Sequence, residues 1–280
     1  NHSLDVDPAL PVLDRSQPSQ AQELLRHHPM KPIPPHSLPL TPHQTALVVF
    51  AKAPIPGQVK TRLCPPLTPD EAATLHGSFV LDTLERTKAA VATLKLPIDR
   101  YLACAPSAAH VFFKIMEERQ GVKLIDQVGD DLGARMNQAF HTLFSQGYRQ
   151  VVLIGTDVPT LPLDHFKLAL TTLENHDLVL GPALDGGYYL IGLKRMAPGL
   201  FTDIPWSTDQ VLRLTQEKAA TIGIKASLIQ PWRDVDSLAD LEALIEVCNA
   251  EAKKAKNDRV FSSRTTGVLQ ALAKRLCSRA

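Results

Sequence analysis

Apolar positions along the chain follow two different periods in turn, which predicts that strands and helices alternate. The short apolar runs at residues 46–50 and 151–154 are too short for helices and are typical of strands buried on both faces. Between them, apolar residues at helical spacing predict one buried face of a helix (Leu75, Phe79, Val80 and Leu84). A strand followed by a buried-face helix is the unit of a parallel sheet.

Further segments repeat this alternation. Residues 100–103, 122–125 and 178–181 are predicted strands, and residues 132–143 are a predicted helix. The sequence Thr68-Pro69-Asp70-Glu71 carries the hydroxyl, proline and glutamate of a helix start. The pattern therefore predicts an α/β fold: a three-layer αβα sandwich around a mostly parallel, Rossmann-like sheet.

The ends of the chain differ in composition from its middle. Residues 1–44 hold nine of the 22 prolines, which is typical of a flexible leader. Residues 251–280 carry eight Lys or Arg and two acids, and form a predicted basic tail with an amphipathic end. We therefore expect one α/β domain over residues 45–250.

Composition excludes several classes of protein. The net charge is +1 and aromatic residues make up 5% of the 280 residues, which argues against nucleic-acid binding. The four cysteines are scattered, so neither a zinc cluster nor a disulfide framework is expected. No apolar run approaches the roughly 20 residues of a membrane helix. We expect a cytoplasmic protein without membrane contact.

The loop after the first strand, FAKAPIPGQVKTRL, concentrates positive charge. Lys52, Lys60 and Arg62 lie within it, two prolines stiffen it, and Gly57 allows a sharp turn. Ammonium and guanidinium groups held toward one point suit a diphosphate or triphosphate. A solvated basic loop is the alternative. The loop matches neither the Walker pattern nor the dinucleotide-binding glycine fingerprint.

Carboxylates follow two later segments. Asp157 comes directly after a buried strand, at the edge where open α/β folds bind ligands. Asp234 and Asp236 share one side of their segment if it is extended. We predict that all three bind Mg²⁺ or Mn²⁺, which prefer oxygen ligands. Alternatively, Asp157 caps the helix that follows it.

Three other groups are candidates for ligand contacts. Asp185 precedes the paired Gly186 and Gly187, which admit a ligand close to the backbone. Asp185 can then bind a sugar or acceptor hydroxyl or act as a base, although Asp-Gly also favours a simple hairpin turn. Trp206 is expected near the same edge, as core or as lid, and Arg135 is a predicted phosphate ligand.

These segments together resemble a known family. FAKAPIPGQVKTRL, GDDLGARM, LIGTDVPTLP, GPALDGGYYLIGL, PWST and DVDSLADL stand in one order over about residues 47–244. They are similar to the bacterial glycosyltransferase-like proteins formerly grouped as a domain of unknown function, which have the nucleotide-diphospho-sugar transferase (GT-A, SpsA-like) fold. More remotely, they resemble the guanylyltransferases of phospholactate and molybdenum-cofactor metabolism.

The resemblance implies nucleotide phosphates at Lys60 and Arg62 and a divalent ion at Asp157 with Asp234 or Asp236. Two reactions then compete. A glycosyltransferase would move a sugar from a nucleotide sugar to a small acceptor and release a nucleoside diphosphate. A nucleotidylyltransferase would join a nucleoside triphosphate to a small phosphorylated acceptor and release pyrophosphate. A nucleotide-binding protein without activity is a third, less favoured, interpretation.

Overall fold

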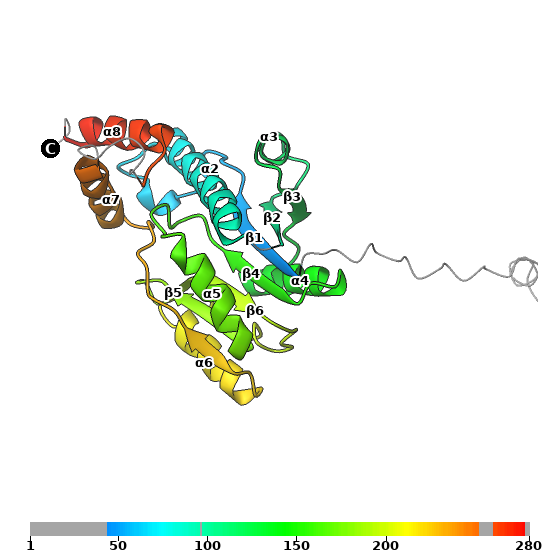
Figure 1. The fold of residues 1–280 in the computed structure, drawn as a ribbon. Helices are drawn as coiled ribbons and strands as arrows, with labels where there is room; N and C mark the ends of the chain where they lie inside the picture. Colours follow the sequence, from blue (N-terminus) through cyan, green and yellow to red (C-terminus); the bar gives the residue numbers. More distant parts are fainter. Residues whose placement is uncertain (1–43, 96, 252–259, 278–280) are drawn as a thin grey trace, which may run out of the picture. The chain divides into compact units, whose positions relative to one another are not determined.

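The structure is a computed structural model that describes residues 44–95, 97–251 and 260–277. The leader predicted over residues 1–44 falls, apart from Gln44, outside the described residues. Within them, seven strands form one sheet in the order β3-β2-β1-β4-β6-β5-β7 (Figure 1). The strands are β1 Thr45–Lys52, β2 Ile98–Ala105, β3 Lys123–Asp126, β4 Gln150–Ile154, β5 Leu178–Pro182, β6 Tyr188–Leu193 and β7 Ala226–Leu228.

The sheet is mostly parallel, as predicted. Only the pairs of β6 with β4 and with β5 are antiparallel, because β5 and β6 form a hairpin. The other neighbours pair in parallel. The carboxyl ends of β1, β4 and β5 therefore meet at one edge, together with the hairpin turn that precedes β6.

Helices cover both faces of this sheet. Alternate residues of β1 point to opposite sides, so Leu47 and Val49 join one core while Ala46 and Val48 join another. The first core packs against α2, α3 and α5, and the second against α4 and α6 (Figure 1). The helices are η1 Thr61–Leu63, α2 Pro69–Leu94, α3 Val111–Gln120, α4 Leu132–Ser145, α5 Asp164–Asn175, α6 Val211–Thr221, α7 Leu238–Glu251 and α8 Ser263–Cys277.

The predicted start of α2 is confirmed. The hydroxyl of Thr68 accepts the N–H of Glu71, and the Glu71 carboxylate accepts the N–H of Thr68 at 2.8 Å. This reciprocal pair satisfies two backbone donors that a helix would otherwise leave open. It also fixes the point at which the loop after β1 enters the helix.

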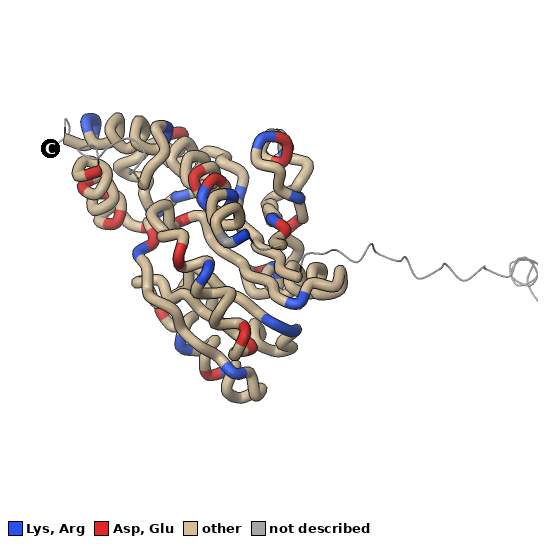
Figure 2. The backbone as a smooth tube through the Cα atoms, in the orientation of Figure 1, with Lys and Arg blue, Asp and Glu red and all other residues tan. Residues whose placement is uncertain are grey.

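A third core lies at the end of the domain and includes α8. Its buried apolar residues come from η1, α2, α7 and α8 and include Leu63, Leu75, Phe79, Leu244, Leu269 and Leu272. Figure 2 shows acidic residues along α7 and basic residues on α8. Arg264 of α8 lies 3.6 Å from both Asp82 and Glu85 of α2. The described part of the expected tail is therefore packed on the domain, because its apolar stripe and its charges both find partners there.

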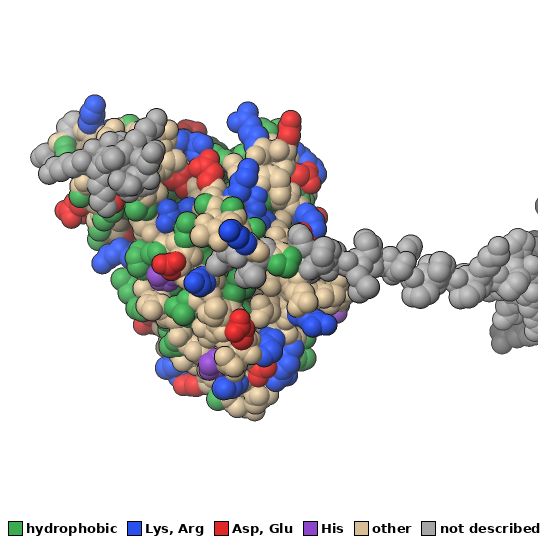
Figure 3. Space-filling view, in the orientation of Figure 1, with side chains coloured by type: hydrophobic (Ala, Val, Ile, Leu, Met, Phe, Trp, Pro, Cys, Tyr) green, Lys and Arg blue, Asp and Glu red, His purple; other side chains and the backbone are tan. Residues whose placement is uncertain are grey.

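The surface carries both charge signs. On the face shown in Figure 3, Lys and Arg are interspersed with Asp and Glu among apolar side chains. Among the described helices, none combines the length and the apolar character that crossing a membrane requires.

Candidate active site

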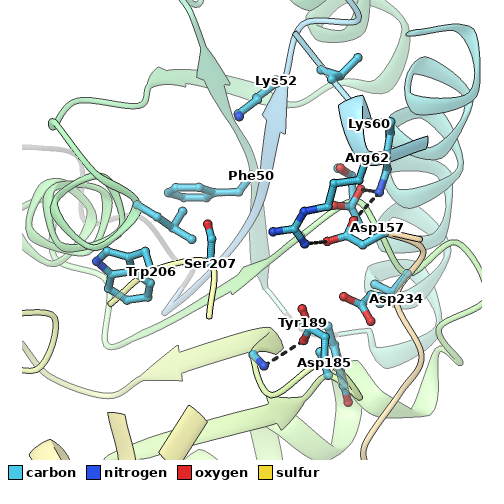
Figure 4. Close-up of a pocket in the computed structure, with 18 of the residues that line it drawn as sticks. Phe50, Lys52, Lys60, Arg62, Asp157, Asp185, Tyr189, Trp206, Ser207 and Asp234 are labelled. Atoms are coloured by element: carbon cyan, nitrogen blue, oxygen red, sulfur yellow. Dashed lines mark hydrogen bonds and ion pairs between the residues drawn. The ribbon is translucent and has the colours of Figure 1, made fainter. Parts of the chain in front are cut away.

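A pocket of about 440 Å³ opens at the edge of the sheet where β1 and β4 end (Figure 4). Most of its wall comes from five segments far apart in the sequence: the end of β1 with the loop after it, the turn after β4, the hairpin between β5 and β6, the loop before α6 and the segment before α7. His76 of α2, Gln127 after β3 and Leu132 of α4 complete the wall. Because β1, β4 and β5 run in the same direction, the residues after each strand reach this edge. The pocket is where the predicted site residues were expected to meet.

The loop after β1 is not extended, because its backbone turns at Gly57 and again at Lys60. Gly57 has φ 78° and Lys60 has φ 49°, and the turn of η1 follows directly. The left-handed conformation costs a residue with a side chain about 1–2 kcal/mol, so contacts of Lys60 must offset it. The turn also separates two cations that an extended segment would place on one face. The side chain of Lys60 is 4% exposed, whereas that of Arg62 is 64% exposed.

The Lys60 ammonium group is surrounded by protein acceptors. It lies 2.7 Å from Asp157 Oδ1 and 3.0 Å from Asp236 Oδ1, and it donates to the carbonyl oxygen of Val235. An ammonium group has three N–H donors, and these three contacts use them all. This differs from the predicted phosphate contact: Lys60 joins two acidic segments instead, while Arg62 keeps its guanidinium group in the pocket.

The two carboxylates keep Lys60 charged. Burial alone would lower the pKa of Lys60, but the charges of Asp157 and Asp236 and their hydrogen bonds outweigh burial and raise the pKa above 10.5. Burial likewise opposes ionisation of Asp157, and the adjacent Lys60 charge lowers the pKa of Asp157 below its usual value. The pair therefore stays ionised at neutral pH.

Asp157 does not cap the following helix, which was the alternative to a role in the site. The N-cap residue of α5 is Leu163, and no side chain caps that position. The Asp157 carbonyl oxygen instead accepts the N–H of Val235 at 2.9 Å. Main-chain and side-chain contacts thus both bind the turn after β4 to the segment before α7.

Asp236 is also one of three carboxylates that form a cluster in the pocket. One oxygen each of Asp185, Asp234 and Asp236 lies within 4.8 Å of the others. A parallel bridge between Ala183 and Trp232 brings the segments of Asp185 and Asp234 together. The structure thus adds Asp185 to the predicted pair, while Lys60 stands between Asp236 and Asp157.

The donor set of this cluster fits a divalent cation. Burial, followed by the charges of Asp185 and Asp236, raises the pKa of Asp234 to about 6. Oxygen ligands on opposite sides of one Mg²⁺ stand about 4.2 Å apart, since each bond is ~2.1 Å, so the cluster is already near the required spacing. A bound cation would offset both the burial and the mutual repulsion that raise the pKa of Asp234.

We expect binding of Mg²⁺ or Mn²⁺ to strengthen as the pH rises from 5 to 7. With its pKa at about 6, Asp234 is largely protonated at pH 5 and ionised at pH 7, and only the ionised carboxylate is a good ligand. Isothermal titration calorimetry of the full chain at several pH values measures this dependence. An affinity that is constant over this range would contradict a metal site that contains Asp234.

The other predicted cations have different surroundings. Lys52 lines the pocket at the end of β1, with no ion pair to a described residue. Arg135 does not line the pocket, and its Nε donates to the carbonyl oxygen of Gly129 at 2.9 Å, next to its own helix. The structure therefore brings Lys52 and Arg62 together with the acidic cluster and leaves Arg135 outside.

The segment of Asp185, Gly186 and Gly187 forms a hairpin turn and also contributes to the pocket wall. Asp185 and Gly187 line the pocket, and the N–H of Gly187 donates to Asp185 Oδ1 at 2.9 Å within the turn. Gly186 has φ 92° and lies under the loop before α6, where an added Cβ would stand 2.1 Å from the Asp209 carbonyl oxygen. Gly186 thus serves the packing of two loops, and the two residues beside it face the pocket.

The wall opposite the charged groups is apolar. Figure 4 shows Phe50, Trp206 and Ser207 on one side of the pocket, facing the side that carries Lys60, Asp157 and Asp234. Trp206 lies directly over Gly133 of α4, where an added Cβ would stand 2.4 Å from the indole. Its ring therefore forms a fixed part of the pocket wall.

Comparison with known proteins places the chain in a family. Residues 88–208 match a family described as an uncharacterized protein conserved in bacteria (DUF2064). A crystal structure of a proposed nucleotide-diphospho-sugar transferase from Desulfovibrio desulfuricans G20 is 33% identical, with a TM-score of 0.70, over 83% of this chain and 96% of that chain. The chain belongs to the DUF2064 family.

Two further solved structures are more distant from this DUF2064 protein. CMP:2-keto-3-deoxy-manno-octonic acid synthetase in complex with CTP is 13% identical, with a TM-score of 0.48, over 74% of this chain and 99% of that chain. A cytidylyltransferase from Leptospira borgpetersenii serovar Hardjo-bovis is 15% identical, with a TM-score of 0.49, over 84% and 96%. Both are too distant to bear on the chemistry of this chain. No curated protein matches it in sequence.

The pocket of this chain is also lined by residues that the sequence pattern did not single out. His76 of α2 is 5% exposed and lines the pocket, and its Nε2 contacts the carbonyl oxygen of Lys52 at 3.0 Å. Burial lowers its pKa, so the neutral ring donates from Nε2 and presents the lone pair of Nδ1. The sequence does contain a signal for this residue, because His76 lies three and four residues before the buried Phe79 and Val80 and so shares their face of the helix. Gln127 and Phe50 were also missed.

Proposed function

We propose that this protein is a metal-dependent transferase that moves a sugar from a nucleotide sugar to a small acceptor. One observation carries the proposal: a three-carboxylate cluster and two cations without buried partners, Lys52 and Arg62, line the same pocket. A nucleotide sugar needs both, because its diphosphate is anionic and departs with the nucleoside. The 33% identical D. desulfuricans protein, itself a proposed nucleotide-diphospho-sugar transferase, supports this choice of donor.

Arg62 is the principal phosphate ligand in this proposal. Its side chain is 64% exposed, and its closest carboxylate oxygen, on Asp236, is 3.9 Å away. An exposed pair at that distance is weak, so a phosphate can replace it at little cost. The planar guanidinium group can then donate two parallel hydrogen bonds. Lys52 adds a point charge from the end of β1.

The cluster of Asp185, Asp234 and Asp236 would hold the divalent cation, Mg²⁺ or Mn²⁺. When bound there, the cation supplies charge that neutralises the phosphate oxygens of the leaving nucleotide. Lys60 holds Asp236 from the other side and fixes the orientation of its carboxylate. Asp157, 41% exposed and paired with Lys60, remains ionised, but it lies outside the group of carboxylates that are close enough to share one cation.

The acceptor is expected between the hairpin and the apolar wall. Trp206 offers the flat apolar face on which a sugar ring packs, and Asp185 lies across the pocket from it. An Asp185 oxygen that is not bound to the cation can accept the proton of an attacking hydroxyl group. The acceptor would thus meet the donor above the acidic cluster.

The first product distinguishes this reaction from its alternative. With Mg²⁺ or Mn²⁺ and a panel of nucleotide sugars, we expect a nucleoside diphosphate to be released and to be visible by ion-exchange chromatography. Release of pyrophosphate from a nucleoside triphosphate would instead identify a nucleotidylyltransferase. Tight binding without turnover over broad donor and acceptor panels would favour a binding protein.

Arg62→Ala tests the phosphate contact separately. Loss of a charge-assisted hydrogen bond should weaken nucleotide binding by about 1.5–3 kcal/mol, or roughly ten- to over a hundredfold. Calorimetry with nucleoside diphosphates and Mg²⁺ measures the difference. Arg213→Ala is the matched control, because Arg213 is 57% exposed and pairs with Glu217 on α6. Equal affinities of the Arg62 variant and the wild type would refute this role.

A further inference from the structure

Gln127 is held at the pocket by three hydrogen bonds to the sheet. It follows β3 directly, and its main-chain N–H donates to the carbonyl oxygen of Cys104 at 3.0 Å. Its side-chain nitrogen donates to the carbonyl oxygens of Ala51 in β1 at 3.0 Å and of Ala103 in β2 at 2.9 Å. The side chain is therefore immobilised across two strands, and it lines the pocket.

These contacts determine which end of the amide is available. Both side-chain partners are carbonyl oxygens, which only accept hydrogen bonds, so the amide nitrogen must be the atom that contacts them. Both of its N–H groups are then used. The oxygen Oε1 accepts no hydrogen bond from the part of the chain that the structure describes, and it is not a buried orphan atom. Gln127 thus presents a fixed acceptor.

Gln127 lies at the end of the pocket that is farther from the acidic cluster, and the distance between these two ends can be compared with the length of a nucleotide sugar. Gln127 contacts β1 and β2, Lys52 ends β1, and the acidic cluster begins after β5. The strand order from β1 to β5 is β1-β4-β6-β5, three steps of about 4.8 Å, or roughly 14 Å. In Figure 4 Lys52 lies at the top of the labelled residues and Asp185 at the bottom. That span matches an extended nucleotide sugar.

We propose that Gln127 Oε1 accepts a hydrogen bond from an N–H group of the nucleobase and so fixes the base end of the donor. This inference rests on the proposed function, because the base reaches Gln127 only if the phosphates lie at Lys52 and Arg62 and the sugar at the acidic cluster. An acceptor that is already immobilised loses little side-chain freedom on binding. Every natural nucleobase has an N–H on its pairing edge, whereas an analogue without that N–H leaves Oε1 unpaired.

The test compares each nucleoside diphosphate with an analogue that lacks the donor. The pairs are cytidine with zebularine, adenosine with nebularine, uridine with 3-methyluridine and guanosine with 1-methylinosine, all as 5′-diphosphates with Mg²⁺. For the natural base that the wild type binds most tightly, we expect the analogue to bind about three- to tenfold more weakly. This arm requires no variant of the protein.

Gln127→Met supplies the second arm, because methionine has a similar length and no amide oxygen. In this variant the natural base and its analogue should bind equally. A preference that persists in the variant would be steric and would overturn the role of Oε1, as would equal binding of the pair by the wild type. If the wild type binds no nucleotide at all, the proposed function fails as well. Binding without discrimination removes only the assignment of Gln127.

Discussion

Replacing Lys60 with methionine is expected to lower the free energy of unfolding by about 3 kcal/mol, because removing one partner of a buried ion pair leaves the other charge unpaired. The Lys60 side chain is 4% exposed and contacts Asp157 and Asp236. Those carboxylates are 41% and 35% exposed and can recover some water, so we expect the lower end of the usual range. Urea unfolding at neutral pH measures the loss.

Arg62→Met is the matched control for this substitution. It removes a cation from the same loop, but one that is 64% exposed and 3.9 Å from its nearest carboxylate, so we expect a change within about 0.5 kcal/mol. The double variant Lys60→Met with Asp157→Asn should recover part of the loss, since it also removes one unpaired charge. A Lys60 variant as stable as the wild type would show that the loop does not depend on this contact.

Asp234→Asn is expected to separate function from stability. It removes one oxygen-ligand charge from the cluster, so we expect Mg²⁺ affinity to fall at least tenfold and metal-dependent turnover by about 10²–10³-fold. Stability should change in the other direction. The pKa of Asp234 is raised to about 6 in the folded state, so ionisation of this group opposes folding above that pH. The neutral variant should unfold at an equal or higher urea concentration at pH 7.5.

Asp203→Asn is the control for the loss of a carboxylate. Asp203 is 83% exposed and lies away from the pocket, and its left-handed backbone conformation is one that asparagine adopts readily. It should therefore leave Mg²⁺ affinity unchanged. If Asp234→Asn bound Mg²⁺ as tightly as Asp203→Asn, the three-carboxylate site would be excluded.

Local chemistry made much of the fold predictable. The Thr68 capping box and the apolar run of β1 depend only on neighbouring residues, and both formed where expected. The helix α3 escaped prediction because its N-cap is His110, which is not a usual capping residue. The strand β7 has three residues and pairs only through β5, so its sequence alone carries little signal.

The site was predictable where spacing along the chain was sufficient. Asp234 and Asp236 lie in one cluster, as an extended segment predicts. Asp185 joins them through the bridge between Ala183 and Trp232, a contact between distant segments that no local pattern reveals. Lys60 and Arg62 would share one face of an extended segment, but the left-handed backbone at Lys60 turns its side chain inward.

The contact between Gly133 and Trp206 has a consequence for the evolution of related chains. The indole occupies the space that a side chain at position 133 would need, with 2.4 Å between the ring and an added Cβ. A side chain at position 133 therefore requires a smaller or displaced side chain at position 206. The side chains that each of these two positions can hold therefore depend on the residue at the other position.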